Sequence, residues 1–265
     1  MRRGLHRVAA TSSGLILVAG LVIAALALRA PADEWTERPV SELVALTESP
    51  DPGTRAHAVV ALAKIGGPEA ETALGAALDD LVWSVRWRAA EGIGRISGAS
   101  RIPLLLQQLR TEVETEEKGE APECAEYYGY VTVPEFLQRQ MGLAIAAVLL
   151  RDKSEQRAVA LRQLTETMAS ATEKLRMRCQ LALVLADLGD RESVPALTEA
   201  LAQEPSGPAR AWSAEALGRL GAQEAVPALT LALEDPYVTP DKQIPLVRQA
   251  AARALEMLRA PVPSG

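Results

Sequence analysis

Residues that could carry catalysis or bind a metal are few in this chain of 265 residues. It contains two His and two Cys, which cannot supply the usual four-ligand zinc site. It has no P-loop, no G-x-S-x-G motif and no glycine run of the dinucleotide-binding kind. We therefore expect neither a metal nor a cofactor.

The remaining candidates for acid–base chemistry are His57 and pairs of carboxylates that are neighbours in the sequence, such as Glu116 and Glu117. Hydrolases usually need a nucleophile, a base and an orienting group. The carboxylate pairs fall where solvated loops are expected, and His57 falls on an ordinary helix surface. We therefore predict that the protein is not an enzyme and has no catalytic residues.

The elements that must position any functional residue come from a recurring thirteen-residue motif. Its gapless copies occupy residues 54–66, 85–97, 177–189, 209–221 and 247–259, and a looser copy occupies 138–150. The second position is arginine in every copy: Arg55, Arg86, Arg139, Arg178, Arg210 and Arg248. Apolar residues at helical spacing, with small residues at most fifth and tenth positions, predict a helix that packs closely against its neighbours.

Each copy is followed by a short turn and a second apolar segment. In three repeats this segment starts with a proline, at Pro103, Pro195 and Pro227. Proline suits the first turn of a helix, because that N–H has no partner inside the helix. The unit is therefore helix–turn–helix, and only stacked pairs of helices can bury the apolar faces. These observations predict an all-α solenoid of about six repeats.

The motif resembles the HEAT-like repeats of the short bacterial kind that also occur in phycobilin lyases. The resemblance covers roughly residues 50–260 and implies an α-solenoid that is mostly a protein-binding scaffold. Some HEAT-like enzymes, such as deoxyhypusine hydroxylase, carry His-Glu metal pairs, and none occurs in this sequence. No residue specifies bilin chemistry, so a lyase-type enzyme is the last of the alternatives.

In HEAT-like repeats the recurrent arginine typically joins a ladder with acids near the start of the helix. Acids precede the six arginines here by four to seven residues: Asp51, Asp80, Glu135, Glu173, Glu204 and Asp241. We therefore interpret the arginines as structural. Arg178→Ala or Arg210→Ala is expected to destabilise the array, because a partly buried acid loses its partner.

The N-terminal segment, residues 1–32, is expected to lie outside the solenoid. Basic residues precede an uncharged run at 8–28, which is long enough to cross a hydrocarbon layer about 30 Å thick. We favour an uncleaved anchor in the inner membrane, with the repeat domain on the periplasmic side. The alternative is a signal peptide cleaved near Ala32, which would give a periplasmic or secreted protein.

Beyond this segment, a linker at 33–49 leads into the repeat domain at 50–260, and a short tail follows at 261–265. Residues 1–32 hold four arginines and no acid, so the rest of the chain has 24 basic and 34 acidic residues. The resulting net charge of −10 repels nucleic acid. We therefore expect no nucleic-acid partner.

An insert at residues 111–134 interrupts the repeats between the second and third copies. Seven Glu face one Lys between positions 112 and 126, and aromatic residues follow: Tyr127, Tyr128, Tyr130 and Phe136. Trp83 and Trp87 start the second repeat's helix, and Tyr237 lies in a second extension. All these aromatics are expected at one edge, because long connections between repeats emerge on the same edge of a solenoid.

These aromatic residues are the candidate partner-binding residues, since aromatic side chains are frequent interface anchors. The glutamates favour a basic protein partner. Two interpretations of residues 113–133 stay open: a contact lip that meets the partner, or a lid whose tyrosines fold back over the second and third repeats.

The two cysteines, Cys124 in the insert and Cys179 in the fourth copy, are expected at the same edge. Oxidising conditions outside the cytoplasm would permit a disulfide, although bridging needs Cα atoms within about 7 Å. The alternative is two unlinked thiols, because Cys is often a small buried apolar residue.

Together these features predict a membrane-tethered, exported scaffold for protein–protein interaction. The alternative is a structural or assembly component without a discrete partner, whose loops merely cover the solenoid.

Overall fold

A computed structural model describes residues 32–118, 127–128, 131–169, 174–240 and 243–259. The described chain is helical apart from one short β-ladder. The helices are α2 Ala32–Thr36, α3 Val40–Leu46, α4 Pro52–Ile65, α5 Pro68–Ala77, α6 Trp83–Ile96, α7 Ile102–Lys118, α8 Val133–Arg151, α9 Glu155–Ala169, α10 Leu175–Asp187, α11 Val194–Gln203, α12 Gly207–Arg219, α13 Val226–Leu231 and α14 Leu246–Arg259.

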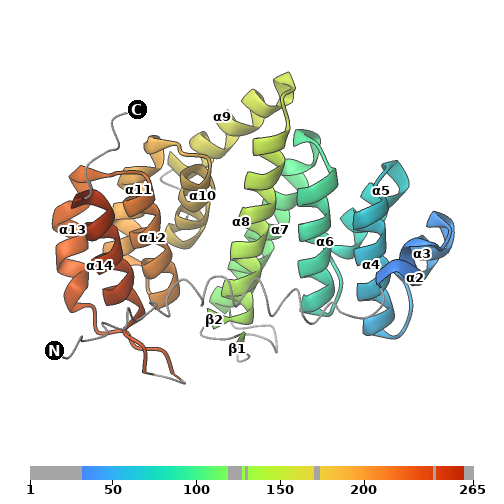
Figure 1. Cartoon of the computed structure of the whole chain (residues 1–265), viewed down its shortest axis with the longest axis horizontal. Helices are drawn as coiled ribbons and strands as arrows, with labels where there is room; N and C mark the ends of the chain where they lie inside the picture. The colour runs from blue at the N-terminus through green and yellow to red at the C-terminus, as the bar shows by residue number, and fades with distance from the viewer. Residues whose placement is uncertain (1–31, 119–126, 129–130, 170–173, 241–242, 260–265) are drawn as a thin grey trace, which may run out of the picture.

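The helices stack as helix–turn–helix repeats (Figure 1). Each copy of the motif forms the first helix of a repeat, and these first helices are α4, α6, α8, α10, α12 and α14. The second helices are α5, α7, α9, α11 and α13. Helices α2 and α3 pack on α4 ahead of the first repeat. The predicted all-α solenoid is confirmed.

Proline and glycine set the ends of several of these helices. Proline stands in the first turn of α4, α5, α11, α12 and α13. Gly189 and Gly221, which follow α10 and α12, have φ angles of 78° and 65°. Residues with a Cβ avoid this left-handed conformation, so glycine ends the helix there at little steric cost.

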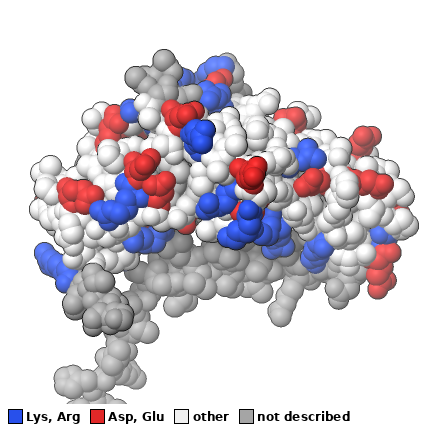
Figure 2. All heavy atoms as spheres, turned by 90° about the horizontal axis from the view of Figure 1, so that it is seen from above, with Lys and Arg blue, Asp and Glu red and all other residues white. Residues whose placement is uncertain are grey.

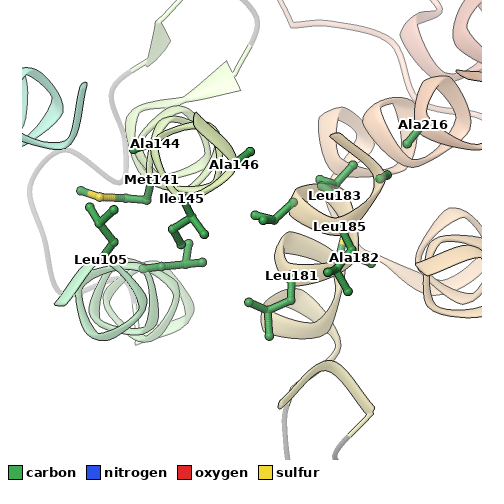
Figure 3. Close-up of a cluster of buried hydrophobic side chains, with 14 of the residues drawn as sticks. Leu105, Met141, Ala144, Ile145, Ala146, Leu181, Ala182, Leu183, Leu185 and Ala216 are labelled. Carbon is green, nitrogen blue, oxygen red and sulfur yellow. The ribbon is translucent and has the colours of Figure 1, made fainter. Parts of the chain in front are cut away.

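Small residues let neighbouring first helices approach closely. A Cβ built on Gly94 of α6 would lie 3.0 Å from the Ala144 Cα of α8, and one on Gly218 of α12 would lie 2.7 Å from the Ala254 Cα of α14. Leu and Ala fill the rest of a core that runs the length of the described array. Figure 3 shows its central part, where Leu105 of α7 faces α8.

Gly218→Ala is expected to destabilise the protein by about 1–3 kcal/mol, because the new methyl group must push α12 away from the backbone of α14. Gly142→Ala in α8 is the matched control, since its Cβ would meet only the ends of side chains, Val184 at 3.3 Å and Arg139 at 3.8 Å. The control also gains up to about 1 kcal/mol of helix propensity. Urea unfolding of both variants checks the difference, and equal destabilisation would contradict the close contact.

The insert is partly helical, which corrects the expectation of a loop from residue 111. Helix α7 continues to Lys118 because Val113 extends the apolar stripe of Leu105 and Leu109 and is itself buried. Further on, β1 Tyr127–Tyr128 pairs with β2 Val131–Thr132 in a two-residue antiparallel ladder that the sequence did not predict.

The predicted membrane anchor, residues 8–28, lies outside the described residues. Within the described ranges, no helix is both long enough and apolar enough to cross a bilayer.

Candidate binding edge

One edge of the solenoid carries the described strands of the insert and the extended connection that follows α13 (Figure 1). Strands β1 and β2 lie on this edge beside the start of α8, and the extended connection after α13 lies on the same edge (Figure 1). The expectation that both extensions emerge together is confirmed. We call this side of the molecule the insert edge.

Among the described side chains, three aromatic rings form a cluster between α6 and the start of α8. The rings of Trp87 and Phe136 meet edge to face at a centroid distance of 5.1 Å, and those of Trp83 and Phe136 at 6.1 Å. Trp83 and Trp87 stack at 6.4 Å because they are one helical turn apart on α6. The guanidinium group of Arg88 lies over the Trp87 ring, with its central carbon 3.7 Å from the ring centroid.

Local signals in the sequence place Phe136 in this cluster. Thr132 and Glu135 form a capping box that fixes the start of α8: the Glu135 N–H donates to the Thr132 hydroxyl, and the Thr132 N–H donates to the Glu135 carboxylate. Phe136 directly follows Glu135, so the capping box also fixes the position of the Phe136 side chain on the first turn of α8. The capping box therefore links the hairpin of the insert to the aromatic cluster.

The cluster differs in exposure from ring to ring. Trp87 is buried against Val133 and Leu137, whereas Trp83 and Phe136 are partly exposed. Leu81, two residues before Trp83, is 93% exposed. The outer part of the cluster is thus an apolar surface that a partner could cover.

The tyrosines of the insert are only partly described. Tyr127 and Tyr128 form β1, but their side chains are not described, and Tyr130 lies outside the described residues. The choice between contact lip and lid therefore stays a prediction.

Tyr237 has a packing role that the sequence did not reveal. A Cβ built on Gly207 would lie 2.2 Å from the Tyr237 ring, so the ring lies directly on the backbone at the start of α12. The Tyr237 N–H also donates to Asp235, at 2.9 Å.

Three of the six arginines make the same set of contacts: Arg55, Arg86 and Arg210. In each, Nη1 donates to the two carbonyls five and six residues earlier. Nε and Nη2 of the same side chain meet a carboxylate 25 or 26 residues later, at Asp80, Glu112 or Asp235. Each of these arginine clamps joins the turn before its own helix to the end of its repeat.

In each clamp the carboxylate that pairs with the arginine therefore lies later in the chain. The carboxylate of the acid that precedes the arginine does not pair with it and makes other contacts. Asp51 caps α4 by accepting the Thr54 N–H at 2.7 Å, and Arg55 pairs with Asp80 instead. Burial by itself would raise the pKa of the Asp80 carboxyl, but hydrogen bonds from Arg55 and the Val82 N–H hold that pKa below its usual value.

Two of the other arginines, Arg139 and Arg178, pair with acids on neighbouring helices. Arg139 pairs with Asp187 of α10 at 2.8 Å, and Arg178 pairs with Glu199 of α11 at 2.8 Å. Glu135, the acid before Arg139, caps α8, whereas Glu173, the acid before Arg178, lies outside the described residues. Asp241, the acid before Arg248, is also outside them.

A buried charge cluster near the insert edge was missed by the sequence analysis. Arg176 lies 3.0 Å from Glu116, 2.7 Å from Glu204 and 4.0 Å from Glu135. Burial raises the pKa of the Glu116 carboxyl above its usual value, and Arg176 only partly opposes this shift. The expectation that Glu116 is solvated is wrong, because α7 carries it into the molecule.

Cys179 does not lie at the exposed edge. It is a free cysteine, its side chain is fully buried, and its Sγ lies 3.6 Å from the Ser213 hydroxyl of α12. The possible bridge to Cys124 is not formed in the structure, and Cys124 itself lies outside the described residues.

In a Cys124→Ser variant, native Cys179 is expected to resist alkylation by iodoacetamide at mildly alkaline pH. Burial raises the pKa of its thiol to about 11, so the reactive thiolate is scarce and inaccessible. Mass spectrometry should find alkylation only after unfolding in urea. Rapid alkylation of the folded protein would contradict the buried position.

One candidate for acid–base chemistry, His57, lies on α4. His57 stacks on Trp35 at a centroid distance of 5.2 Å. Within the described ranges, no group of three or more His, Cys, Asp or Glu could hold a metal ion. Acidic and basic side chains are interspersed on the face seen from above, opposite the insert edge (Figure 2).

Comparisons with known proteins agree with this architecture. A family model described as HEAT repeats matches residues 17–124 and 161–256. No curated protein matches the chain significantly.

Similar solved structures include human deoxyhypusine hydroxylase in complex with glycerol, with 20% identity, a TM-score of 0.31, and coverage of 84% of this chain and 96% of that one. The complex of CpcE and CpcF of phycocyanin lyase from Nostoc sp. PCC7120 gives 17% identity, a TM-score of 0.40, and coverage of 97% and 98%. The structure of Escherichia coli YibA gives 16% identity and a TM-score of 0.28, and it covers 97% of this chain and 100% of that one. These similarities are too distant to support an argument about activity. The family match extends over most of the stacked helix pairs, and the chain belongs to the HEAT-repeat family.

Proposed function

We propose that this HEAT-repeat protein is a non-enzymatic scaffold that binds a basic protein partner along its insert edge. The observation that carries the proposal is the aromatic cluster at the base of an acidic insert, with Leu81 93% exposed beside it. A half-exposed tryptophan on a rigid helix is the kind of residue that dominates binding energy at protein interfaces.

The charge of the insert supports a basic partner. Two of its seven glutamates, Glu112 and Glu116, pair with Arg86 and Arg176 inside the molecule. The sequence supplies five more between Glu114 and Glu126 against the single Lys118. Such an excess accelerates the encounter with a positively charged surface and makes the association rate sensitive to salt. In this proposal the tyrosines of the insert act as a contact lip.

We also propose that residues 8–28 tether the scaffold to the inner membrane, with the repeats on the periplasmic side. The support is the uncharged run behind an arginine-rich start. A cleaved signal near Ala32 is the alternative. Carbonate extraction of envelopes and the N-terminal mass of the mature protein separate the two: the tether predicts an intact N-terminus in the membrane pellet.

Site-specific photo-crosslinking tests the binding surface. A photoreactive residue at Leu81 is expected to capture a discrete partner in the native envelope, and the yield should fall at high salt. Val159 on α9 is the matched control, because it is an aliphatic residue with 64% exposure outside the insert edge. Equal labelling patterns from both positions would reject a binding surface at the insert edge.

Replacement of residues 119–130 by a short Gly-Ser linker separates the lip from the lid. The boundaries keep Glu116 in its ion pair and Thr132 in its capping box. A lip predicts near-normal thermal unfolding with loss of the crosslink from Leu81, since loop length by itself has little effect on stability. A large drop in the melting temperature with an unchanged crosslink would assign the tyrosines to a lid.

A further inference from the structure

The junction between α8 and α10 is packed differently from three other junctions between first helices. At α4–α6, α6–α8 and α12–α14 a glycine of one helix lies against an alanine of the other. In α8 the corresponding contact of Gly142 is with the end of the Val184 side chain, 3.3 Å from a built Cβ. Side chains, rather than close backbone contact, therefore separate α8 from α10 at this point.

Polar contacts bridge this junction. The Gln180 side chain of α10 donates to Gln138 of α8 at 3.4 Å, and both side chains are fully buried. Gln138 donates in turn to Glu116, at 2.6 Å. The ion pairs Arg176–Glu116 and Arg139–Asp187 also join the two sides.

Hydrogen bonding at this junction is incomplete. Among the described residues, seven buried side-chain atoms have no hydrogen-bond partner, and six of them belong to residues of α8, α10 and the end of α11. Three of these residues, Arg139, Gln180 and Asp187, make contacts between α8 and α10. The other three, Arg176, Arg178 and Glu204, pair between α10 and the end of α11 or its side chains. Some of the atoms lie in ion pairs whose geometry is not that of a hydrogen bond, such as Arg176 Nε beside Glu204. An unmet buried polar group costs free energy, so polar contacts hold this junction less firmly than apolar packing of the same area would.

We propose that the solenoid bends at the α8–α10 junction, with residues 32–169 and 174–259 as two arms. Opening a glycine–alanine junction exposes apolar surface, which opposes the motion. Opening the α8–α10 junction lets water bind the polar atoms that lack partners, which favours it. Proteins open where local stability is lowest. The apolar core continues across the junction through residues such as Ala146 and Leu181, which keeps the arms joined (Figure 3).

Distances between spin labels test the bend in the full chain carrying Cys124→Ser. Exposed positions on second and last helices suit the labels: Glu69 on α5, Gln107 on α7, Gln203 on α11 and Glu256 on α14. The pair 107/203 spans the junction, whereas the pairs 69/107 and 203/256 lie within single arms. The distance distribution of the spanning pair is expected to be at least about twice as wide as those of the within-arm pairs. Equal widths would overturn the proposal.

A second variant tests the cause. Gln138→Leu combined with Gln180→Leu replaces the buried amide contact by an apolar one of similar volume. The spanning distribution is expected to narrow toward the within-arm widths. If the double variant folds and its 107/203 distance distribution is as wide as that of the parent, the role given to the polar contacts is overturned. If the double variant does not fold, the labelled parent still decides whether the junction bends.

Discussion

Arg86→Met is expected to destabilise the solenoid by about 3–5 kcal/mol, because it leaves a buried carboxylate without its partner. Glu112 is 4% exposed and lies 2.7 Å from Arg86 Nε, inside the second repeat. The same substitution removes the hydrogen bonds from Arg86 to the Asp80 and Leu81 carbonyls, which hold the preceding turn. Urea unfolding should show a lower midpoint.

Two variants separate this effect from general loss of charge. Arg95→Ala removes an arginine of the same helix whose ion pair with Glu91 is 59% exposed on the arginine side, and its unfolding midpoint is expected to stay within experimental error. Arg86→Met with Glu112→Leu removes both buried charges and is expected to recover most of the lost stability. A single Arg86→Met variant as stable as the parent would show that the clamp is not structural.

The helices and repeats could be predicted because their signals are local. Apolar spacing and the prolines of the second helices act within one or two turns of the residues they control. The small residues of the motif also predicted close helix packing, which Gly218 against Ala254 confirms.

The sequence predicted that the recurrent arginines pair with acidic residues, but not which acidic residue each arginine meets. An acid near a helix start was expected, but the partner of Arg210 is Asp235, 25 residues later, and the nearer Glu204 pairs with Arg176. Which acid meets which arginine depends on how one repeat folds back on itself. That arrangement is tertiary and is not encoded in spacing along one helix.

The buried part of the insert was missed because its composition is acidic. Glutamate-rich segments are usually solvated, and this rule outweighed the helical spacing of Glu112, Val113 and Glu116. The ion-pair partners are distant in sequence, since Glu112 pairs with Arg86 and Glu116 pairs with Arg176, sixty residues later. The continuing i, i+4 spacing beyond Leu109 was the available signal that α7 runs on.

Trp87→Ala is expected to destabilise the protein by about 3–5 kcal/mol, the usual effect of removing a large buried aromatic ring. Trp87 is 7% exposed, meets Phe136 edge to face at 5.1 Å and packs on Val133 and Leu137. The ring therefore joins α6 to the start of α8 directly below the insert. The loss should appear as a lower urea midpoint together with weaker near-ultraviolet circular dichroism.

Trp83→Ala is the matched change one turn earlier, and its main effect is expected on binding. Because Trp83 is partly exposed whereas Trp87 is buried, its removal should cost less stability than that of Trp87 and should reduce partner capture through Leu81. The two variants therefore divide the aromatic cluster into a buried half that holds α6 against α8 and an outer half that meets the partner. If Trp83→Ala unfolds as readily as Trp87→Ala while an otherwise folded Phe136→Ala variant keeps full capture, the cluster is purely structural and the binding surface must lie elsewhere.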